Sequence, residues 1–209
     1  MIRALIAALM LLAAPAFAQE VAPAPPVPEK VWRTETVRLE TAQGPILIAL
    51  EVERAPVTSA NFLKYVDQKK FDGATFYRAL TFAGRPDLGL VQGGAKSDPK
   101  RLLPPIAHEP TTKTGLSHTE GAVSMARGAV GSAQGDFFII LGNLNSLDAD
   151  PSKPGDNAGF AVFGRVVEGM DVVKTILAAP VSATEGVGAM KGQMIAKPIP
   201  IKSARRAQK

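Results

Sequence analysis

The chain has 209 residues, of which 46% are hydrophobic and 21% are charged. This composition is typical of a globular protein with one core, and it excludes a disordered or fibrous chain. The absence of cysteine excludes disulfides, thiol catalysis and cysteine-ligated metal sites. The formal net charge is +5, but much of the excess lies in the last eight residues. The sequence therefore lacks the basic face with interleaved aromatic residues that nucleic-acid binding needs.

The first 18 residues have the pattern of a secretory signal peptide. Arg3 is followed by an apolar run over residues 4–14, and Ala16-Phe17-Ala18 forms a small-x-small cleavage site. The apolar run is too short to cross a bilayer, which takes about 20 residues. We therefore expect residues 1–18 to be removed on export, leaving a mature chain that starts near Gln19 and is not inserted in a membrane.

The mature chain divides into three parts. Residues 19–33 are rich in proline, which is typical of a semi-rigid polyproline linker. The folded domain is expected over residues 34–203, and residues 204–209 are expected to form a short basic tail in solvent.

Short apolar segments in the domain predict a mostly antiparallel β-barrel covered by two helices. Two strands over residues 36–40 and 46–52 are separated by a Gln-Gly-Pro turn, and Pro56 is suited to the first turn of a helix over residues 56–66. Irregularly spaced runs that alternate with glycine favour a barrel or sandwich over an alternating α/β fold. The remaining predicted elements are apolar runs at 74–80, 89–92, 121–126, 137–141 and 160–167, a helix over 168–177 and a last strand over 193–201.

Three motifs that would point to other chemistry are incomplete. The segment Gly93-Gly94-Ala95-Lys96-Ser97 lacks the glycine that precedes the lysine of a phosphate-binding loop. His108 and His118 stand ten residues apart, without the spacing of a helical metal pair, and are expected to be solvated loop residues. No Gly-x-Ser-x-Gly sequence is present. We expect neither a metal nor a cofactor.

Six segments between residues 36 and 178 carry a family resemblance. They are Ala55-Pro56-Val57-Thr58-Ser59-Ala60-Asn61-Phe62, Phe76-Tyr77-Arg78, Gln92-Gly93-Gly94, Ser124-Met125-Ala126, Phe137-Phe138-Ile139 and the segment 161–173. In this order they resemble the cyclophilin family of peptidyl-prolyl cis-trans isomerases, most closely its bacterial exported branch. The resemblance implies a closed eight-stranded antiparallel barrel capped by two helices, a periplasmic location, a monomer, and X-Pro segments of unfolded or flexible proteins as partners.

The resemblance also implies the roles of the site residues. Rotation about an X-Pro bond has a barrier of about 20 kcal/mol, because the amide loses its resonance in the twisted transition state. Arg78 is the expected catalytic residue, donating a hydrogen bond to the prolyl nitrogen, and Gln92 orients it. An apolar pocket for the proline ring is expected from Phe138, Leu90 and Leu147. The other expected substrate contacts are Ala126, Phe160, Tyr77, Asp136 and Arg127.

The sequence departs from the family pattern at several positions. Thirteen residues separate Arg78 from Gln92, where the family has seven, so a loop centred on residues 84–87 is expected to bulge beside the active face. Phe82 is a candidate to fill the aromatic position that Gly89 leaves vacant. Asp136 and Arg127 replace uncharged family residues and could pair across the groove.

Two alternatives to an isomerase stay open at this point. One is a peptide-binding or chaperone module on the same fold that has lost turnover. The other is an unrelated barrel that binds a small ligand in its interior. Arg78 discriminates the first alternative from the enzyme, because a pure binder needs no donor at the prolyl nitrogen.

Overall fold

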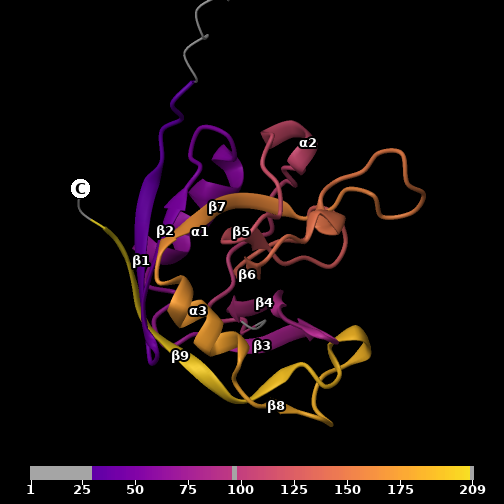
Figure 1. The fold of residues 1–209 in the computed structure, drawn as a ribbon. Coiled ribbons are helices and arrows are strands. Elements are labelled where there is room, and N and C mark those ends of the chain that lie inside the picture. The colour runs from indigo at the N-terminus through magenta and orange to yellow at the C-terminus, as the bar shows by residue number, and fades with distance from the viewer. Residues whose placement is uncertain (1–29, 96–97, 208–209) are drawn as a thin grey trace, which may run out of the picture. The chain divides into compact units, whose positions relative to one another are not determined.

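The computed structural model describes residues 30–95 and 98–207 (Figure 1). The predicted signal peptide and most of the proline-rich linker lie outside these residues. The barrel unit begins at Trp32, close to the predicted start of the domain.

The described residues form nine antiparallel strands, of which eight close into a barrel. The order around the barrel is β1-β2-β7-β5-β6-β4-β3-β9, and β9 pairs back to β1. The predicted closed eight-stranded barrel is thereby confirmed, and β8 pairs only with β9 outside the closure. The strands are β1 (Glu35–Thr41), β2 (Gly44–Leu50), β3 (Thr75–Phe82), β4 (Arg85–Gly94), β5 (Ala122–Met125), β6 (Asp136–Leu141), β7 (Ala161–Glu168), β8 (Val181–Ser182) and β9 (Met194–Arg206).

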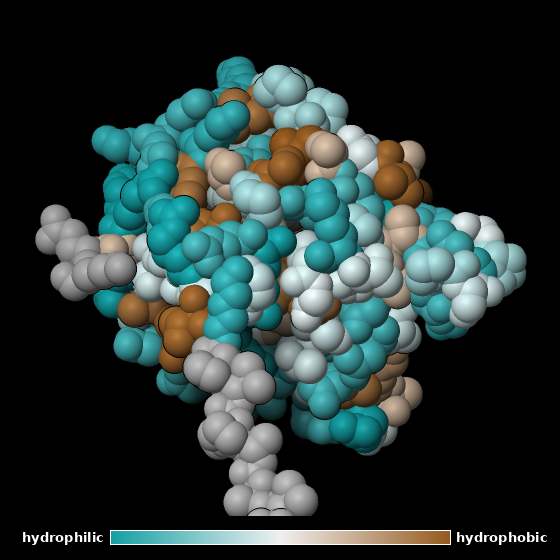
Figure 2. Space-filling view, turned by 90° about the horizontal axis from the view of Figure 1, so that it is seen from above, coloured by the Kyte–Doolittle hydropathy of each residue, from teal (hydrophilic) through white to brown (hydrophobic). Residues whose placement is uncertain are grey.

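Alternating side chains of the strands fill the barrel. In β2, Ile46, Ile48 and Leu50 point inward and are completely buried, while the residues between them are partly exposed. Phe62 packs against Phe137 at the centre, with 5.3 Å between ring centroids. The face seen in Figure 2 is mostly hydrophilic, with hydrophobic residues in small separate patches.

Two helices cover the barrel as predicted. The first, α1 (Pro56–Asp67), packs against β7 and β9, and α3 (Met170–Leu177) packs against β2, β3 and β4 (Figure 1). The described residues add one helical turn, α2 (Thr111–Thr114), and two 3-10 turns, η1 (Asn145–Leu147) and η2 (Gly188–Met190), none of which was predicted. Within the described part of the chain, none of the helices has the length and apolar content needed to cross a bilayer.

The start of α1 is capped by a residue from a distant loop. Ala55 occupies the N-cap position and cannot accept a hydrogen bond through its side chain. Instead Glu109 Oε2 accepts hydrogen bonds from the Thr58 backbone N–H (2.8 Å) and the Thr58 hydroxyl (2.7 Å). The Glu109 side chain is buried. A carboxylate here also interacts favourably with the positive end of the helix dipole.

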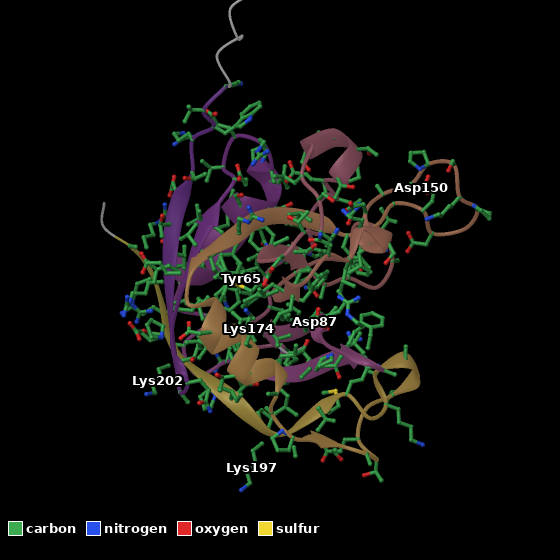
Figure 3. All side chains as sticks on the ribbon, in the orientation of Figure 1. Tyr65, Asp87, Asp150, Lys174, Lys197 and Lys202 are labelled. Carbon is green, nitrogen blue, oxygen red and sulfur yellow. The ribbon has the colours of Figure 1, made fainter. Side chains whose placement is uncertain are left out.

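The last strand is longer than predicted. β9 runs to Arg206, so residues 204–206 belong to the barrel rather than to a solvated tail. Arg205 pairs with Asp72 and Arg206 with Asp67, each at 2.7 Å. The pairing of this strand with β3 contains a register shift, from Phe76↔Ile199 to Arg78↔Met194. In Figure 3, Lys197 and Lys202 point away from β9, whereas Tyr65 lies inside the molecule.

The insertion after Arg78 forms strand rather than a loop. It extends the β3–β4 hairpin to the pair Phe82↔Arg85, with a register shift between Thr81 and Phe82 that leaves residues 86–88 as a bulge. Gly84 has φ +75° in the two-residue turn, a conformation that glycine adopts without strain. Hairpin pairing satisfies backbone groups that an open loop would leave to water, which explains the difference from the expectation.

Candidate active site

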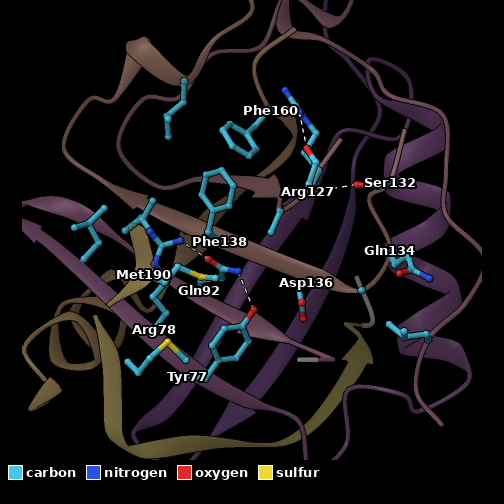
Figure 4. Close-up of a pocket in the computed structure, with 18 residues that line it drawn as sticks. Tyr77, Arg78, Gln92, Arg127, Ser132, Gln134, Asp136, Phe138, Phe160 and Met190 are labelled. Atoms are coloured by element: carbon cyan, nitrogen blue, oxygen red, sulfur yellow. Dashed lines mark hydrogen bonds between the residues drawn. The ribbon is translucent and has the colours of Figure 1, made fainter. Parts of the chain in front are cut away.

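All ten residues predicted for the site line one cavity of about 540 Å³ (Figure 4). They are Tyr77, Arg78, Leu90, Gln92, Ala126, Arg127, Asp136, Phe138, Leu147 and Phe160. The remaining lining residues are Leu80, Leu102, Gly128, Ser132, Gln134, Gly135, Met190 and Met194. The site is built mainly on β3, β4 and β6, whose rigid pairing fixes the backbone under each polar side chain.

Arg78 and Gln92 are direct cross-strand partners on β3 and β4. Arg78 Nη1 donates to Gln92 Oε1 at 2.8 Å, and Gln92 Nε2 donates to the Tyr77 hydroxyl at 2.8 Å. Figure 4 shows Gln92 between Arg78 and Tyr77, joined by both hydrogen bonds. Both ends of the Gln92 amide are hydrogen-bonded, so its oxygen must face Arg78.

Burial keeps the phenol of Tyr77 protonated. Burial is the largest influence and raises the pKa of Tyr77 well above its usual value, and the negative charge of Asp136 adds to the increase. Asp136 also forms a hydrogen bond with Tyr77 that favours the neutral phenol. The Tyr77 hydroxyl can therefore donate to Asp136 while it accepts from Gln92, which fixes the direction of the whole chain of bonds.

Arg78 is held by neutral acceptors in a half-buried position. Its Nε donates to Gln193 Oε1 at 2.8 Å, so both of its hydrogen-bonded partners are amides. Within residues 30–95 and 98–207 no carboxylate forms an ion pair with it, and Nη2 has no hydrogen-bond partner. Burial lowers the pKa of Arg78, but an arginine guanidinium stays charged in proteins. The cavity thus contains a cation whose Nη2 donates to none of the described residues.

Apolar side chains form the wall beside this cation. Phe138 is 3% exposed and packs with Leu90 in a cluster that also contacts Leu147 and Phe160. The rings of Phe138 and Phe160 meet edge to face, with 5.4 Å between centroids. A charged donor and an apolar pocket of this size suit a small ring attached to a polar backbone.

The comparison with known families matches this arrangement. Residues 36–206 match the family described as "Cyclophilin type peptidyl-prolyl cis-trans isomerase/CLD". The chain belongs to the cyclophilin-type peptidyl-prolyl cis-trans isomerases. This match covers all eight strands of the barrel almost completely.

Curated relatives of this cyclophilin are isomerases. It is 35% identical over 176 residues to "Peptidyl-prolyl cis-trans isomerase A" of Dickeya dadantii, covering 83% of this chain and 85% of that protein. It is 35% identical over 149 residues to "Peptidyl-prolyl cis-trans isomerase" of Acinetobacter baylyi, covering 70% and 73%. A Cryptosporidium parvum cyclophilin-type isomerase, solved in the presence of the dipeptide Ala-Pro, shares the fold with a TM-score of 0.66 at 19% identity, covering 84% of this chain and 100% of that one.

His118 was expected to be solvated, and this expectation was wrong. It is completely buried in the cyclophilin, with Nδ1 at 2.5 Å from Asp148 Oδ1 and Nε2 at 2.9 Å from Ser124 Oγ. Ser124 is also completely buried, so this serine, histidine and aspartate cannot reach a substrate. His108 is half-buried, with Nε2 at 2.9 Å from the Ala158 carbonyl. Neither histidine belongs to a metal-ligand cluster within the described residues.

Arg127 does not pair with Asp136 as hypothesised. Its guanidinium forms two hydrogen bonds with Asp156, at 2.7 and 2.8 Å, and also donates to the Gly159 carbonyl. It lies 5.0 Å from the centre of the Phe160 ring. Arg127 therefore fixes the loop that carries Phe160 rather than bridging the groove.

Phe82 does not fill the vacant aromatic position. It is 44% exposed at the end of the hairpin and is not among the lining residues. Met190 and Met194 contribute apolar surface to the cavity instead. Sequence reasoning missed these two residues and Gln193, because the segment before β9 has no motif.

Proposed function

We propose that this cyclophilin accelerates rotation about X-Pro bonds by donating a hydrogen bond from Arg78 to the prolyl nitrogen in the twisted transition state. The observation that supports this role is the half-buried guanidinium beside an apolar pocket, which is held by two neutral amides and whose Nη2 has no partner in the described part of the chain. Phe138, Leu90 and Leu147 would hold the proline ring.

The chemistry of the reaction suits such a site. In the ground state the prolyl nitrogen shares its electron pair with the carbonyl, so it is a poor acceptor. In the twisted state this resonance is lost and the nitrogen can accept a hydrogen bond, so a fixed cationic donor stabilises the transition state more than the substrate. Reducing a ~100 s event to milliseconds requires about 7 kcal/mol, which a charged donor together with orientation of the substrate can supply.

We further propose that the protein acts on flexible X-Pro segments of exported proteins in the periplasm. The support is the order of features in residues 1–18, with a positive residue, a short apolar run and a small-x-small site. N-terminal sequencing of the protein purified from the periplasmic fraction tests this. We expect a start at Gln19, whereas a chain that keeps Met1 and stays in the cytoplasm contradicts the proposal.

The role of Arg78 is tested by NMR exchange spectroscopy on an Ala-Pro peptide. We expect wild type to catalyse exchange and Arg78→Ala to lose about a hundredfold or more in kcat/KM. Arg85→Ala is the matched control, because Arg85 is an exposed arginine paired with Asp87 outside the cavity. Full activity of Arg78→Ala contradicts the mechanism. Peptide binding by wild type without any exchange would identify a binding module instead of an enzyme.

A further inference from the structure

Arg78 has a second amide partner that comes from outside the β3–β4 pair. We propose that Gln193 is a positioning residue for Arg78, holding the guanidinium so that Nη2 faces the prolyl nitrogen. The inference rests on the proposed role of Arg78 as the donor. It assigns a function to a residue of the connection before β9.

The contact is built from several hydrogen bonds. Arg78 Nε donates to Gln193 Oε1 at 2.8 Å. The other end of the amide is also engaged, because Gln193 Nε2 donates to the Ala189 carbonyl at 2.7 Å. A flipped amide would direct its N–H groups at the N–H groups of Arg78 and lose both bonds. The orientation of Gln193 is therefore determined by its own surroundings as well as by Arg78.

The backbone of Gln193 is tied to the strand that carries Arg78. Its carbonyl accepts from the Ala79 N–H at 3.0 Å, and its N–H donates to the Met190 carbonyl at 3.1 Å. Met194 is the cross-strand partner of Arg78 in the β3–β9 pairing. The Gln193 side chain thus starts from a fixed point next to Arg78, which is the condition for precise positioning.

Two anchors on different nitrogens determine where the guanidinium lies. Gln193 holds Nε and Gln92 holds Nη1. Because the guanidinium is planar, fixing these two nitrogens also fixes Nη2. With Gln92 alone, the group could turn about its bond to that amide and direct Nη2 away from the substrate.

Gln92 and Gln193, the two side chains that hold Arg78, are both uncharged, and the proposed catalysis depends on this. A carboxylate at position 193 could form an ion pair with Arg78 and offset its charge in a partly desolvated cavity. An amide of the same shape accepts the hydrogen bond and leaves the charge available. This difference separates a positioning role from a merely structural one, because Gln193→Glu keeps the shape of the side chain and changes its charge.

The same connection also supplies part of the pocket wall. Met190 ends η2 and Met194 starts β9, and both line the cavity. The Gly192 N–H donates to the Glu185 carbonyl at 2.9 Å, which closes the connection on itself. Gln193 lies between these two methionines in the chain. One short segment therefore supplies both the hydrogen-bond acceptor for Arg78 and the apolar side chains that line the cavity beside it.

The test measures kcat and KM separately, with peptide exchange followed by NMR. We expect Gln193→Ala to lower kcat about tenfold, because one charge-assisted hydrogen bond to Arg78 is lost. KM is expected to change less than twofold. Gln193→Glu is expected to lower kcat at least as much, and Gln193→Asn to recover part of it. Lys191→Ala is the matched control on the same connection, because its side chain is exposed. Unchanged kcat in both Gln193→Ala and Gln193→Glu overturns the inference.

A double-mutant cycle separates this inference from the role of Arg78. In the Arg78→Ala background, Gln193→Ala is expected to have no further effect on kcat, since the group it positions is absent. A full additional loss would mean that Gln193 acts independently, and the inference would be wrong. If Arg78→Ala itself keeps the wild-type rate, the proposed function of Arg78 fails instead. The Arg78 Nε–H resonance provides a check that does not depend on activity, because it is expected to shift upfield in Gln193→Ala.

Discussion

The imidazole of His118 lies almost parallel to the Phe138 ring, with 5.9 Å between the ring centroids and 13° between the planes. Phe138 forms the floor of the proposed proline pocket, so the pocket is supported from behind by a completely buried histidine. Hydrogen bonds at both ring nitrogens fix the imidazole between Asp148 and Ser124. The floor of the pocket is therefore connected to a titratable group that no substrate can touch.

His118 is expected to make the stability of the protein depend on pH. Burial is the largest influence and lowers the pKa of His118 below 6.5, although the hydrogen bond and charge of Asp148 act in the opposite direction. The unfolded chain then binds the proton more readily than the folded one. The stabilisation is fully present above pH 6.5 and is lost as the pH falls through the lower pKa of the folded state.

Urea denaturation between pH 7.5 and 5 measures this effect. His118→Gln is expected to be less stable overall, but its free energy of unfolding should fall less steeply below pH 6.5, by up to about 1.4 kcal/mol per pH unit. Asp148 titrates in a lower pH range than His118. Burial raises the pKa of Asp148, but the hydrogen bonds from Ser117 and His118 outweigh it, so this carboxyl titrates below 3.8. Parallel pH profiles for wild type and variant would contradict the prediction.

Removal of Arg127 is expected to weaken substrate binding more than removal of its ion-pair partner. The Arg127 side chain is 4% exposed, packs against Phe160 and bonds the Gly159 carbonyl, whereas the Asp156 side chain is 54% exposed. Exposed ion pairs contribute little, while the packing and the partly buried hydrogen bonds to Gly159 are lost only in Arg127→Ala. We expect KM to rise about five- to tenfold in Arg127→Ala and less than twofold in Asp156→Ala. Peptide titrations followed by NMR check both values, and equal effects would show that the ion pair itself matters.

The barrel and the core of the site could be predicted because their signals are local. The motif around Arg78 and the one at Gln92 each occupy a few consecutive residues, and their order identifies the strands that carry them. Cross-strand pairing then places Arg78, Gln92 and Phe138 side by side. Tyr77, the neighbour of Arg78, lines the same cavity because a register shift between Phe76 and Arg78 interrupts the strand alternation. All ten predicted residues line the same cavity.

The errors come from contacts between residues distant in sequence. His118 lies in a stretch rich in proline and threonine, which suggests a solvated loop, but it is completely buried and bonded to Asp148, thirty residues away. No sequence motif around Glu109 marks it as a helix cap, and only the folded structure brings it to the start of α1. Gln193 is fifteen or more residues beyond any motif, so the sequence offers no reason to connect it with Arg78. Polar partners of this kind are determined by the closure of the barrel.

Glu109 is expected to stabilise the fold by capping α1, without affecting catalysis. Its Oε2 accepts two buried hydrogen bonds from Thr58, and the N-cap residue Ala55 offers no alternative acceptor. Glu109→Ala should lower the free energy of unfolding by about 2 kcal/mol, with kcat/KM unchanged at a temperature where the protein stays folded. Glu109→Gln keeps one acceptor and should lose less. Urea denaturation measures the difference. An equal loss in both variants would mean that the negative charge, rather than an acceptor oxygen at this position, is responsible, and unchanged stability of Glu109→Ala would contradict the capping role.

Shortening the β3–β4 hairpin tests whether the insertion takes part in the reaction. Residues 82–88 lie beyond the pair Thr81↔Gly89 and none of them lines the cavity. Replacing them with Asn-Gly, which suits a two-residue hairpin turn, should therefore preserve the strand register at Arg78 and Gln92. We expect kcat/KM within about twofold of wild type and a small loss in Tm, because only the half-buried Leu88 loses packing. A large fall in kcat with an intact barrel by circular dichroism would show that the hairpin reaches the substrate in solution. In that case the length of the hairpin, and not only the residues of the cavity, would have to be counted as part of the active site.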